Sequence, residues 1–448
     1  MVSFIDEKWT VINQWSVCGL PVGKFVLNPI LWIVVLACLR YGMESTSYQL
    51  GNDSLDYVNF NQNVFAGETD ARRTPLYPLL IKFSGFVTRE TIRVAQNRSQ
   101  DAFQTVAMEL QSGEKGIRTL VLLQKLIFIL ALLALWQTGK KIVQNQWFLF
   151  AGILMICHFF YSWQWTILTE GLSISFTCFF FALIVSYLLQ PSSLKAFSLG
   201  IFVFLMIMLR PAFAYLAILL TLFWLLCLAF PKNDRRQACF GLGGMAVCMG
   251  LLLGYCQLNQ ANFGVFALTN VGKNNQFYVI EHSGFFRSST DRELVDFIER
   301  APVSEAYRFE KVRGLIEEKF GRERLEEFTS DLVSSHPAAY VQAAFRLFWA
   351  ARSECGLNLY VLAGAGDFML ILWLWLFLRR IPWIRLTTWG LFYGLAAVVI
   401  LNAPTEYDRL FAPAAPIVFL ICVRAADFFC IAYYEPAADC VEYLKRTL

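Results

Sequence analysis

Charged residues are scarce in this chain. They make up 16% of its 448 residues, whereas soluble globular proteins carry about 25%. Hydrophobic residues make up 57% of the sequence and aromatic residues 16%, and the mean hydropathy is +0.50. This composition excludes an ordinary soluble protein and indicates a membrane protein. The net charge is only +4, and nothing in the composition suggests a nucleic-acid partner.

Metal-binding and redox motifs are missing as well. The three histidines are scattered without the spacing of metal ligands, and the twelve cysteines form no Cys-x-x-Cys pair. Most of these cysteines lie in apolar runs, where cysteine behaves as a small buried hydrophobic residue. The chain has no glycine-rich phosphate loop, no nucleotide-binding pattern and no internal repeat. Residues 1–20 contain no continuous apolar core, which argues against a cleavable signal peptide.

Long apolar segments dominate the rest of the chain. Each is close to the roughly 20 residues that an α-helix needs to cross a bilayer core about 30 Å thick. The sequence therefore predicts an all-α polytopic membrane protein. We expect about ten spans, near residues 25–40, 117–137, 147–163, 170–189, 195–210, 212–230, 239–258, 357–378, 386–402 and 411–432.

Lysine and arginine in the short connections predict the orientation. Cytoplasmic loops are enriched in these residues. If ten spans alternate, the basic residues fall on one side, at Lys140-Lys141, Lys195, Lys232, Arg235-Arg236, Arg379-Arg380, Arg385 and Lys445-Arg446. Both termini are then cytoplasmic, and the long loops and the turns near Thr169, Arg210 and Thr405 face outside. The lack of organelle signals favours a bacterial plasma (inner) membrane, with the active site on its outer, periplasmic side.

The predicted organisation follows from these spans. Both outer loops are too short for a standard independent domain, and we expect them to form a small helical cap on the bundle. Mixed charges at helical spacing in the second loop are typical of solvated helix faces. The expected parts are a cytoplasmic N-terminus at 1–24, a membrane core at 25–258 with a first outer loop at 40–116, a second outer loop at 259–356, C-terminal helices at 357–432 and a cytoplasmic tail at 433–448.

Acidic residues of the first outer loop are the first candidates for chemistry. Asp53 and Asp56 lie three residues apart, so on a helix they share a face. One carboxylate could act as a general base on an incoming hydroxyl or amine, or hold a metal that does so. The alternative is that Asp53 caps a helix and Asp56 is a solvated acid of its first turn.

Ionisable residues at the outer ends of the spans form a second group. Glu170 begins the fourth span, where a charge is costly unless it faces a cavity or a partner; the alternative is a capping glutamate. Arg72 and Arg73 could bind a lipid phosphate, since guanidinium matches phosphate with paired donors, or could attract headgroups. Arg210, before Pro211, is either an interface anchor or a phosphate ligand.

Further outer cations are weaker candidates. Arg409 belongs to the cluster Glu406-Tyr407-Asp408-Arg409 before the last span, which could equally be a solvated turn. Lys273 and Arg346 lie in the second outer loop. The sequence alone leaves their roles open.

Several of these segments together resemble a known superfamily. Asp53-Ser54-x-x-Tyr57, followed by Arg73-Thr74-Pro75-Leu76-Tyr77-Pro78-Leu79-Leu80, resembles the first outer loop of the C-type (GT-C) glycosyltransferases, which include protein O-mannosyltransferases and the lipid A aminoarabinose transferase. Glu170, Arg210-Pro211 and Arg409-Leu410-Phe411-Ala412-Pro413 fall where that superfamily has recurring positions. The resemblance covers roughly residues 25–255 and 335–432, and the charged region 285–334 matches nothing in it.

The resemblance implies an inverting glycosyltransferase with a sugar donor on a polyprenyl or dolichyl phosphate. The acceptor would be a glycan, lipid or protein at the outer face of the membrane. Asp53 would be the base with Asp56 in reserve, and Glu170 would position substrate or a cation. The candidate substrate-binding residues are Tyr57, Arg72, Arg73, Tyr77, Lys273, Arg210, Arg346 and Arg409.

No cofactor is certain, and a divalent cation stays open. Many relatives have a paired acidic motif, whereas Asp53 lies between Asn52 and Ser54. Two alternatives to the glycosyltransferase remain. One is an O-antigen ligase or polymerase, whose functional residues would lie in the late outer loop. The other is a transporter or flippase of lipid-linked sugars.

Overall fold

The computed structural model describes a helical protein. Every regular element in the described residues is a helix, which confirms the all-α prediction for that part of the chain. The described residues are 57, 67, 73–85, 114–143, 145–160, 162–164, 166–229, 235–269, 271–301, 308–351, 383–402, 411–414, 416–417, 420–423 and 427.

The helices fall into three groups along the chain. A short helix in the segment predicted as the first outer loop is α5 (Leu76–Phe83). The bundle helices are α7 (Glu114–Gly139), α8 (Gln146–Phe160), α9 (Thr169–Leu189), α10 (Ser193–Leu209), α11 (Ala214–Ala229), α12 (Arg235–Phe263) and α19 (Trp383–Asn402). The segment predicted as the second outer loop contains α13 (Val271–His282), α14 (Arg292–Arg300), α15 (Arg308–Phe320), α16 (Arg322–Ser335) and α17 (Pro337–Ala351). Single 3₁₀ turns are η3 (Ser162–Gln164), η4 (Pro211–Phe213), η5 (Phe285–Ser288) and η6 (Ala412–Ala414).

Four of the described helices are long and apolar enough to cross a membrane, which supports an integral membrane protein. They are Arg118–Gly139, Thr169–Leu189, Pro211–Ala229 and Arg235–Phe263. Two further apolar helices, α8 and α10, have 15 and 17 residues, fewer than the roughly 20 of a full crossing. The spans predicted at 25–40 and 357–378 lie outside the described residues, and ten spans therefore stay a prediction.

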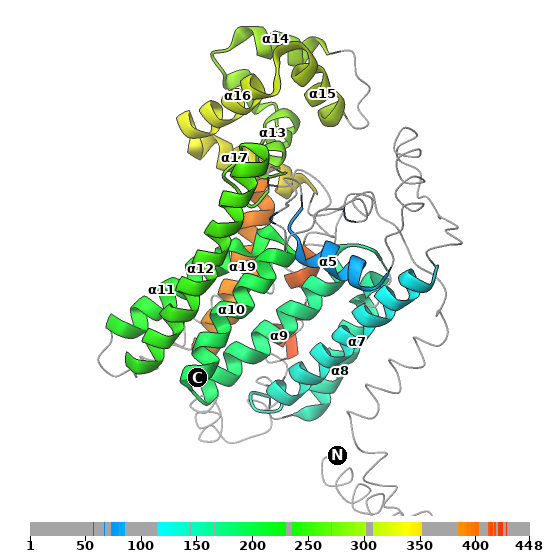
Figure 1. Ribbon diagram of the computed structural model, residues 1–448, viewed down its shortest axis with the longest axis vertical. Helices are drawn as coiled ribbons and strands as arrows, with labels where there is room; N and C mark the ends of the chain where they lie inside the picture. The colour runs from blue at the N-terminus through cyan, green and yellow to red at the C-terminus, as the bar shows by residue number, and fades with distance from the viewer. Residues whose placement is uncertain are drawn as a thin grey trace, which may run out of the picture.

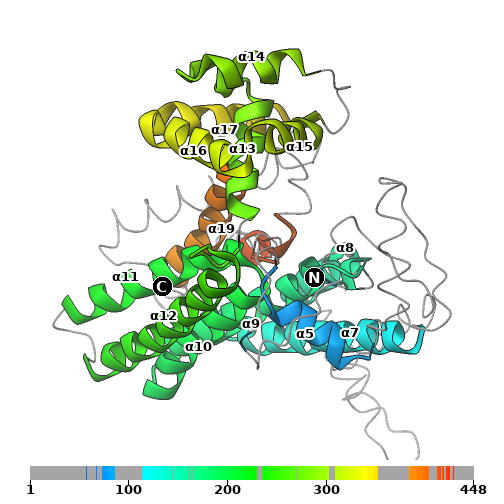
Figure 2. The same ribbon diagram turned by 45° about the horizontal axis from the view of Figure 1, so that its top comes forward.

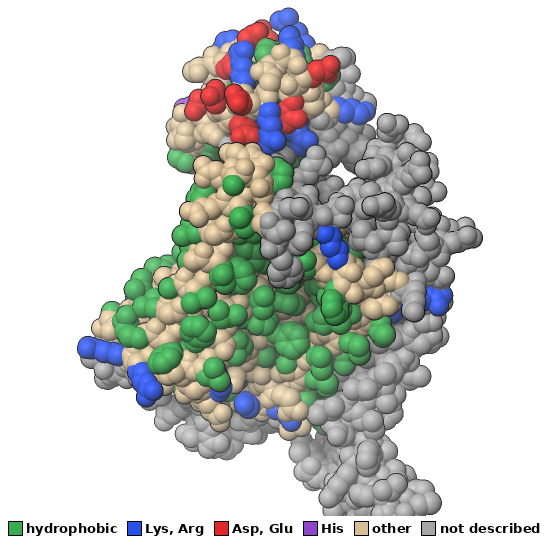
Figure 3. Space-filling view, in the orientation of Figure 1, with side chains coloured by type: hydrophobic (Ala, Val, Ile, Leu, Met, Phe, Trp, Pro, Cys, Tyr) green, Lys and Arg blue, Asp and Glu red, His purple; other side chains and the backbone are tan. Residues whose placement is uncertain are grey.

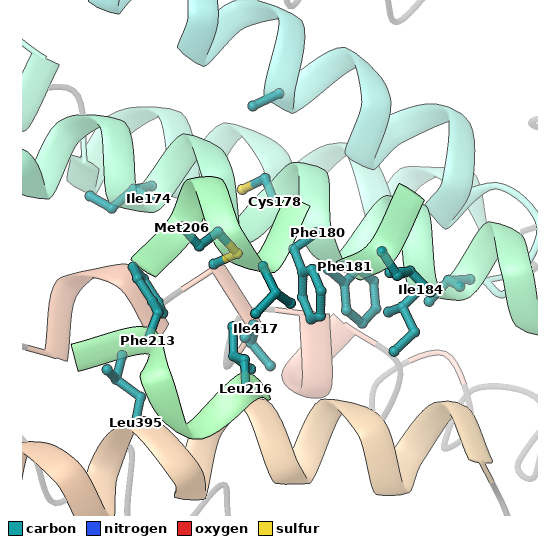
Figure 4. Packing of buried hydrophobic residues seen from close by; sticks show 14 of the residues in the cluster. Ile174, Cys178, Phe180, Phe181, Ile184, Met206, Phe213, Leu216, Leu395 and Ile417 are labelled. Atoms are coloured by element: carbon teal, nitrogen blue, oxygen red, sulfur yellow. The ribbon is translucent and has the colours of Figure 1, made fainter. Parts of the chain in front are cut away.

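The bundle has one large apolar core. Figures 1 and 2 show α7 to α12 side by side, with α19 running from the bundle toward the second-loop helices. Figure 4 shows the centre of the core, where Phe180 and Phe181 of α9 lie near Met206 of α10, Leu216 of α11 and Ile417. Residues more than 200 positions apart in the sequence thus share one core.

Helices α10 and α12 approach each other closely through glycine. A Cβ added to Gly200 would collide with the backbone of Gly244, and one added to Gly244 would collide with the backbone of Phe197. Small residues at a membrane helix interface allow such approach and strengthen van der Waals packing. The position of α10, and therefore of the residue that ends it, depends on these two glycines.

The helices of the second outer loop form a cap with its own apolar core. Phe277, Ile298 and Phe328 are buried in it. Its outer surface is charged, as Figure 3 shows, whereas the bundle face is mainly hydrophobic. The ion pair Arg322–Glu326 follows helical spacing, and Glu318, Lys319 and Arg322 are exposed, which agrees with the predicted solvated helix faces.

Helix α17 joins the cap to the bundle. It begins at Pro337. Tyr340, buried in the cap core, donates a hydrogen bond to the Leu401 carbonyl of α19. Phe348, two turns further on, belongs to the bundle core and contacts Phe411. One face of α17 therefore holds both cores together.

Helix α5 differs slightly from its predicted start. The Thr74-Pro75 pair predicts a helix with Thr74 as its cap, but Pro75 takes the cap position and no side chain caps the helix. Thr74 is buried instead. Tyr77 and Ile81 face inward and Phe83 faces outward, as expected for an amphipathic segment.

Candidate functional site

The first turn of α9 places an acidic side chain inside the protein. Leu168 is extended and precedes the helix, so Thr169 and Glu170 lie in its first turn. Amide groups at a helix N-terminus carry partial positive charge and stabilise a carboxylate. Glu170 is only 2% exposed, which requires a partner for its charge.

That partner is Arg210, at the end of the next helix. Arg210 leaves the α-helical conformation, and Pro211 starts η4, because proline favours a first turn and cannot continue a helix. Nη2 of Arg210 lies 3.7 Å from Oε1 of Glu170, and the Arg210 side chain is 11% exposed. Sequence reasoning required a cavity or a partner for Glu170, and the structure supplies the partner.

The pair also agrees with the prediction that successive spans cross the membrane in alternating directions. The N-terminal end of α9 and the C-terminal end of α10 meet, as they must in antiparallel neighbours. Each charge lies at the helix end that favours it, the carboxylate at an N-terminus and the guanidinium at a C-terminus. The turns near Thr169 and Arg210 therefore lie on the same side of the bundle.

Aromatic and basic residues of the first outer loop lie next to this pair. The Arg73 guanidinium carbon is 4.8 Å from the centre of the Tyr57 ring, a cation–π distance. The rings of Tyr57 and Tyr77 meet edge to face at 5.1 Å between centroids. The Tyr57 hydroxyl is 3.4 Å from Oγ1 of Thr169, which links the loop to the residue before Glu170.

A buried glutamine holds α5 in place. The Tyr77 hydroxyl donates to Oε1 of Gln124 at 2.8 Å. Nε2 of Gln124 donates to the carbonyls of Gln164 at 2.9 Å and Thr166 at 3.4 Å. Gln124 is fully buried in α7. Its amide thus connects the first outer loop, the α7 span and the segment that leads into α9.

Sequence reasoning did not single out Gln124. The available signal was its position, since a polar residue inside a predicted span is a functional candidate by default. The carbonyl of Arg73 accepts a weaker contact of 3.5 Å from the Tyr255 hydroxyl of α12. Tyr255 was missed too, because a tyrosine in an apolar helix carries no specific signal.

Electrostatics tie α5 to the buried pair. The pKa of the Tyr77 phenol is raised well above its usual value, first by burial and then by Tyr57 and the negative charge of Glu170. Lack of solvent favours the neutral phenol, and a nearby carboxylate opposes a second negative charge. Tyr77 therefore stays a neutral hydrogen-bond donor beside Glu170.

The predicted site residues divide into three sets. The first comes together around the α9 start: Tyr57, Arg73, Tyr77, Glu170 and Arg210. The second lies outside the described residues: Asp53, Asp56, Arg72 and Arg409. The third lies elsewhere, with Lys273 in α13, where only its backbone is described, and Arg346 exposed on α17.

The described residues offer no metal site. Among them, no group of three or more His, Cys, Asp or Glu residues could hold a metal ion, and hard divalent cations take six or more oxygen ligands. Glu170 faces the cation of Arg210 instead. Asp53 and Asp56, the candidate metal ligands of the sequence, lie outside the described part of the chain.

Comparison with known proteins identifies no family. No protein-family model and no curated protein matches the sequence. Among solved structures, the archaeal oligosaccharyltransferase AglB from Archaeoglobus fulgidus, in complex with an inhibitory peptide and a dolichol-phosphate, is similar at 12% sequence identity and a TM-score of 0.45. The similarity covers 91% of this chain and 51% of that one, so the chain spans about half the length of AglB. A likeness this weak assigns neither a family nor an activity.

Proposed function

We propose that the chain is an inverting glycosyltransferase that moves a sugar from a polyprenyl-phosphate donor to an acceptor at the outer face of the membrane. The observation that carries the proposal is the buried Glu170–Arg210 pair at one end of an apolar helix bundle. Arg73 and the tyrosines Tyr57 and Tyr77 adjoin it. The motif resemblance of the first outer loop agrees with the same activity.

The chemistry needs positive charge where the lipid phosphate departs. As the acceptor oxygen attacks the anomeric carbon with inversion, the bond from that carbon to the phosphate oxygen breaks, and polyprenyl phosphate leaves. Fixed cations stabilise the developing negative charge, and arginine matches phosphate with paired donors. Arg210 lies at the C-terminal end of the apolar helix α10, and we expect this end to lie at the outer membrane surface, where a lipid phosphate would be.

The acceptor must also lose a proton, and this requires a base. Asp53 and Asp56 precede Tyr57 by four residues and one residue in the sequence. The Tyr57 hydroxyl lies 3.4 Å from Thr169, the neighbour of Glu170. This connection supports the first-loop carboxylates as the base, with Asp53 first and Asp56 in reserve. Glu170, ion-paired to Arg210, is better suited to positioning than to taking a proton.

The location of the charges favours an enzyme over a transporter. Transporters hold substrate near the bilayer midplane, between repeats. Glu170 and Arg210 instead lie at helix ends. An O-antigen ligase would depend on the late outer loop, where Arg346 is exposed on the cap and makes none of the contacts that join the five clustered residues.

Purified protein in nanodiscs, supplied with polyprenyl-phosphate hexoses and pentoses and a membrane-extract acceptor, tests the proposal. Release of polyprenyl phosphate measures turnover. Asp53→Asn and Arg210→Gln should each lower turnover by about a hundredfold or more, the usual effect of losing one group that stabilises the transition state. Arg322→Gln in the solvated cap is the matched control and should not change it. Undiminished turnover in both site variants would refute the assignment, and loss on Arg346→Gln alone would favour the ligase.

A further inference from the structure

Arg210 and Glu170 form a buried ion pair, and their different chemistry suggests a different role for each residue. We infer that Arg210 is the residue that binds the phosphate, and that Glu170 is its internal counter-ion, which the phosphate displaces. The inference rests on the proposed function, because it names the group that recognises the lipid phosphate. It predicts that removal of the Glu170 carboxylate strengthens phosphate binding, the opposite of what a phosphate or cation ligand would do.

The geometry of the pair is that of a loosely held arginine. Its atoms are 3.7 Å apart, longer than a hydrogen bond. Within the described part of the chain, Nη1 of Arg210 is buried without a hydrogen-bond partner. A guanidinium has five N–H donors, and a buried donor without a partner is unfavourable. Arg210 is therefore charge-compensated, but its hydrogen-bonding capacity is not filled.

A phosphate monoester would fill that capacity. It offers several oxygens to the planar fork of a guanidinium. Phosphate and the Glu170 carboxylate cannot both lie against Arg210 at low cost, since like charges repel strongly where water is scarce. Phosphate binding must therefore weaken the pair. Without the carboxylate, the buried Arg210 loses its charge partner among the described residues, and its attraction for phosphate rises.

Arg210 fits this role better than the other two candidate cations whose side chains the structure describes. The guanidinium of Arg73 lies over the Tyr57 ring. Arg346 is exposed on the cap. Arg210 is paired with a carboxylate that itself lies in a helix first turn. That helix end stabilises Glu170 in both states, so the carboxylate can release Arg210 without moving into water.

Binding of farnesyl phosphate to the full chain in detergent tests the inference. Glu170→Gln should lower Kd by about tenfold, equivalent to about 1.4 kcal/mol. Arg210→Gln should raise Kd at least as much, and the double variant should match Arg210→Gln. Glu326→Gln, on the cap surface, is the control and should change nothing. If Glu170→Gln does not fold, Glu170→Asp lengthens the pair and should shift Kd in the same direction by less.

The outcomes separate the inference from the proposed function. If Arg210→Gln weakens binding but Glu170→Gln binds equally or less tightly, the counter-ion inference is refuted and the proposed function stands. If the unmodified protein does not bind farnesyl phosphate, both are refuted. Inorganic phosphate could also bind as tightly as farnesyl phosphate and show the same tenfold lower Kd in Glu170→Gln. This result would support displacement of Glu170 from Arg210 by phosphate and would contradict a lipid donor.

Discussion

Gly244→Ala should destabilise the bundle, whereas the same change one residue earlier, Gly243→Ala, should not. A Cβ at position 244 would meet the backbone of Phe197, while one at position 243 meets nothing within 4 Å. Backbone atoms cannot rotate away as a flexible side chain can, so α10 and α12 must separate. Because α10 ends at Arg210, the separation should also disturb the Glu170–Arg210 pair.

The two variants differ only in packing. Both gain the helix propensity of alanine over glycine, about 0.5–1 kcal/mol. Overpacking a tight interface costs about 1–3 kcal/mol, and only Gly244→Ala incurs it. The free energies of unfolding of the two variants should therefore differ by about 1–3 kcal/mol, with Gly243→Ala the more stable.

Unfolding can be followed in detergent by the reactivity of buried thiols. Cys178 and Cys248 are free and buried in the bundle, so a thiol-reactive dye should label them only as the bundle opens. Midpoints of thermal or denaturant unfolding then rank the variants. Equal midpoints for Gly243→Ala and Gly244→Ala would refute the close approach of α10 and α12.

Two further predictions concern the first outer loop and the cap. Because the pKa of Tyr77 is raised in the folded state, ionisation of its phenol has no effect on stability below its usual pKa of about 10. Above this pH the phenol ionises first in the unfolded chain, so the free energy of unfolding falls as pH rises, by about 1.4 kcal/mol per pH unit. Tyr77→Phe should therefore lose less stability than the unmodified protein between about pH 9 and about pH 11. Equal losses would contradict the burial of this phenol. In the cap, Phe328→Ala should lower the free energy of unfolding by about 3–5 kcal/mol because Phe328 is buried. Arg322→Ala should lower it by no more than about 0.5 kcal/mol, since the pair of Arg322 with Glu326 is exposed. Denaturant unfolding compares the two variants, and similar losses would contradict a separate cap core.

Much of the helical framework could be predicted from local signals. Apolar length and flanking polar residues placed α7, α9, α11 and α12 to within a few residues, because desolvation of the backbone forces such segments into helices. Proline fixed the break at Arg210-Pro211, since it suits a first turn. Helix α12 extends beyond its apolar part to Phe263, and hydropathy could not indicate this because a helix can continue outside the membrane.

The contacts of the site could not be predicted in the same way. Glu170 and Arg210 are 40 residues apart, and the predicted topology indicated only that both lie on the same side of the membrane. Their distance depends on how α9 packs on α10 and α10 on α12, which is a property of side-chain fit across helices. Gln124 was missed for a related reason, since its importance comes from Tyr77 and the carbonyls that it reaches.

The site is built from two separately supported halves. Arg210 and Glu170 are positioned by bundle packing, through the α10–α12 approach. Tyr57, Arg73 and Tyr77 are positioned by the Gln124 amide and by the ring contacts. If the first half binds phosphate and the second presents the acceptor and its base, the halves should respond to different variants.

Gln124→Leu tests this division. It removes the acceptor of the Tyr77 hydroxyl and the donor to the carbonyls of Gln164 and Thr166, and unpaired buried polar groups cost about 1–3 kcal/mol each. The first outer loop should loosen while Arg210 stays in place, so turnover should fall with the Kd for farnesyl phosphate unchanged. Gly244→Ala should act mainly on phosphate binding: it should raise the Kd for farnesyl phosphate, and turnover should fall only as far as weaker binding explains. Parallel changes of Kd and turnover in both variants would mean that phosphate binding and first-loop chemistry form one unit, and that the division is wrong.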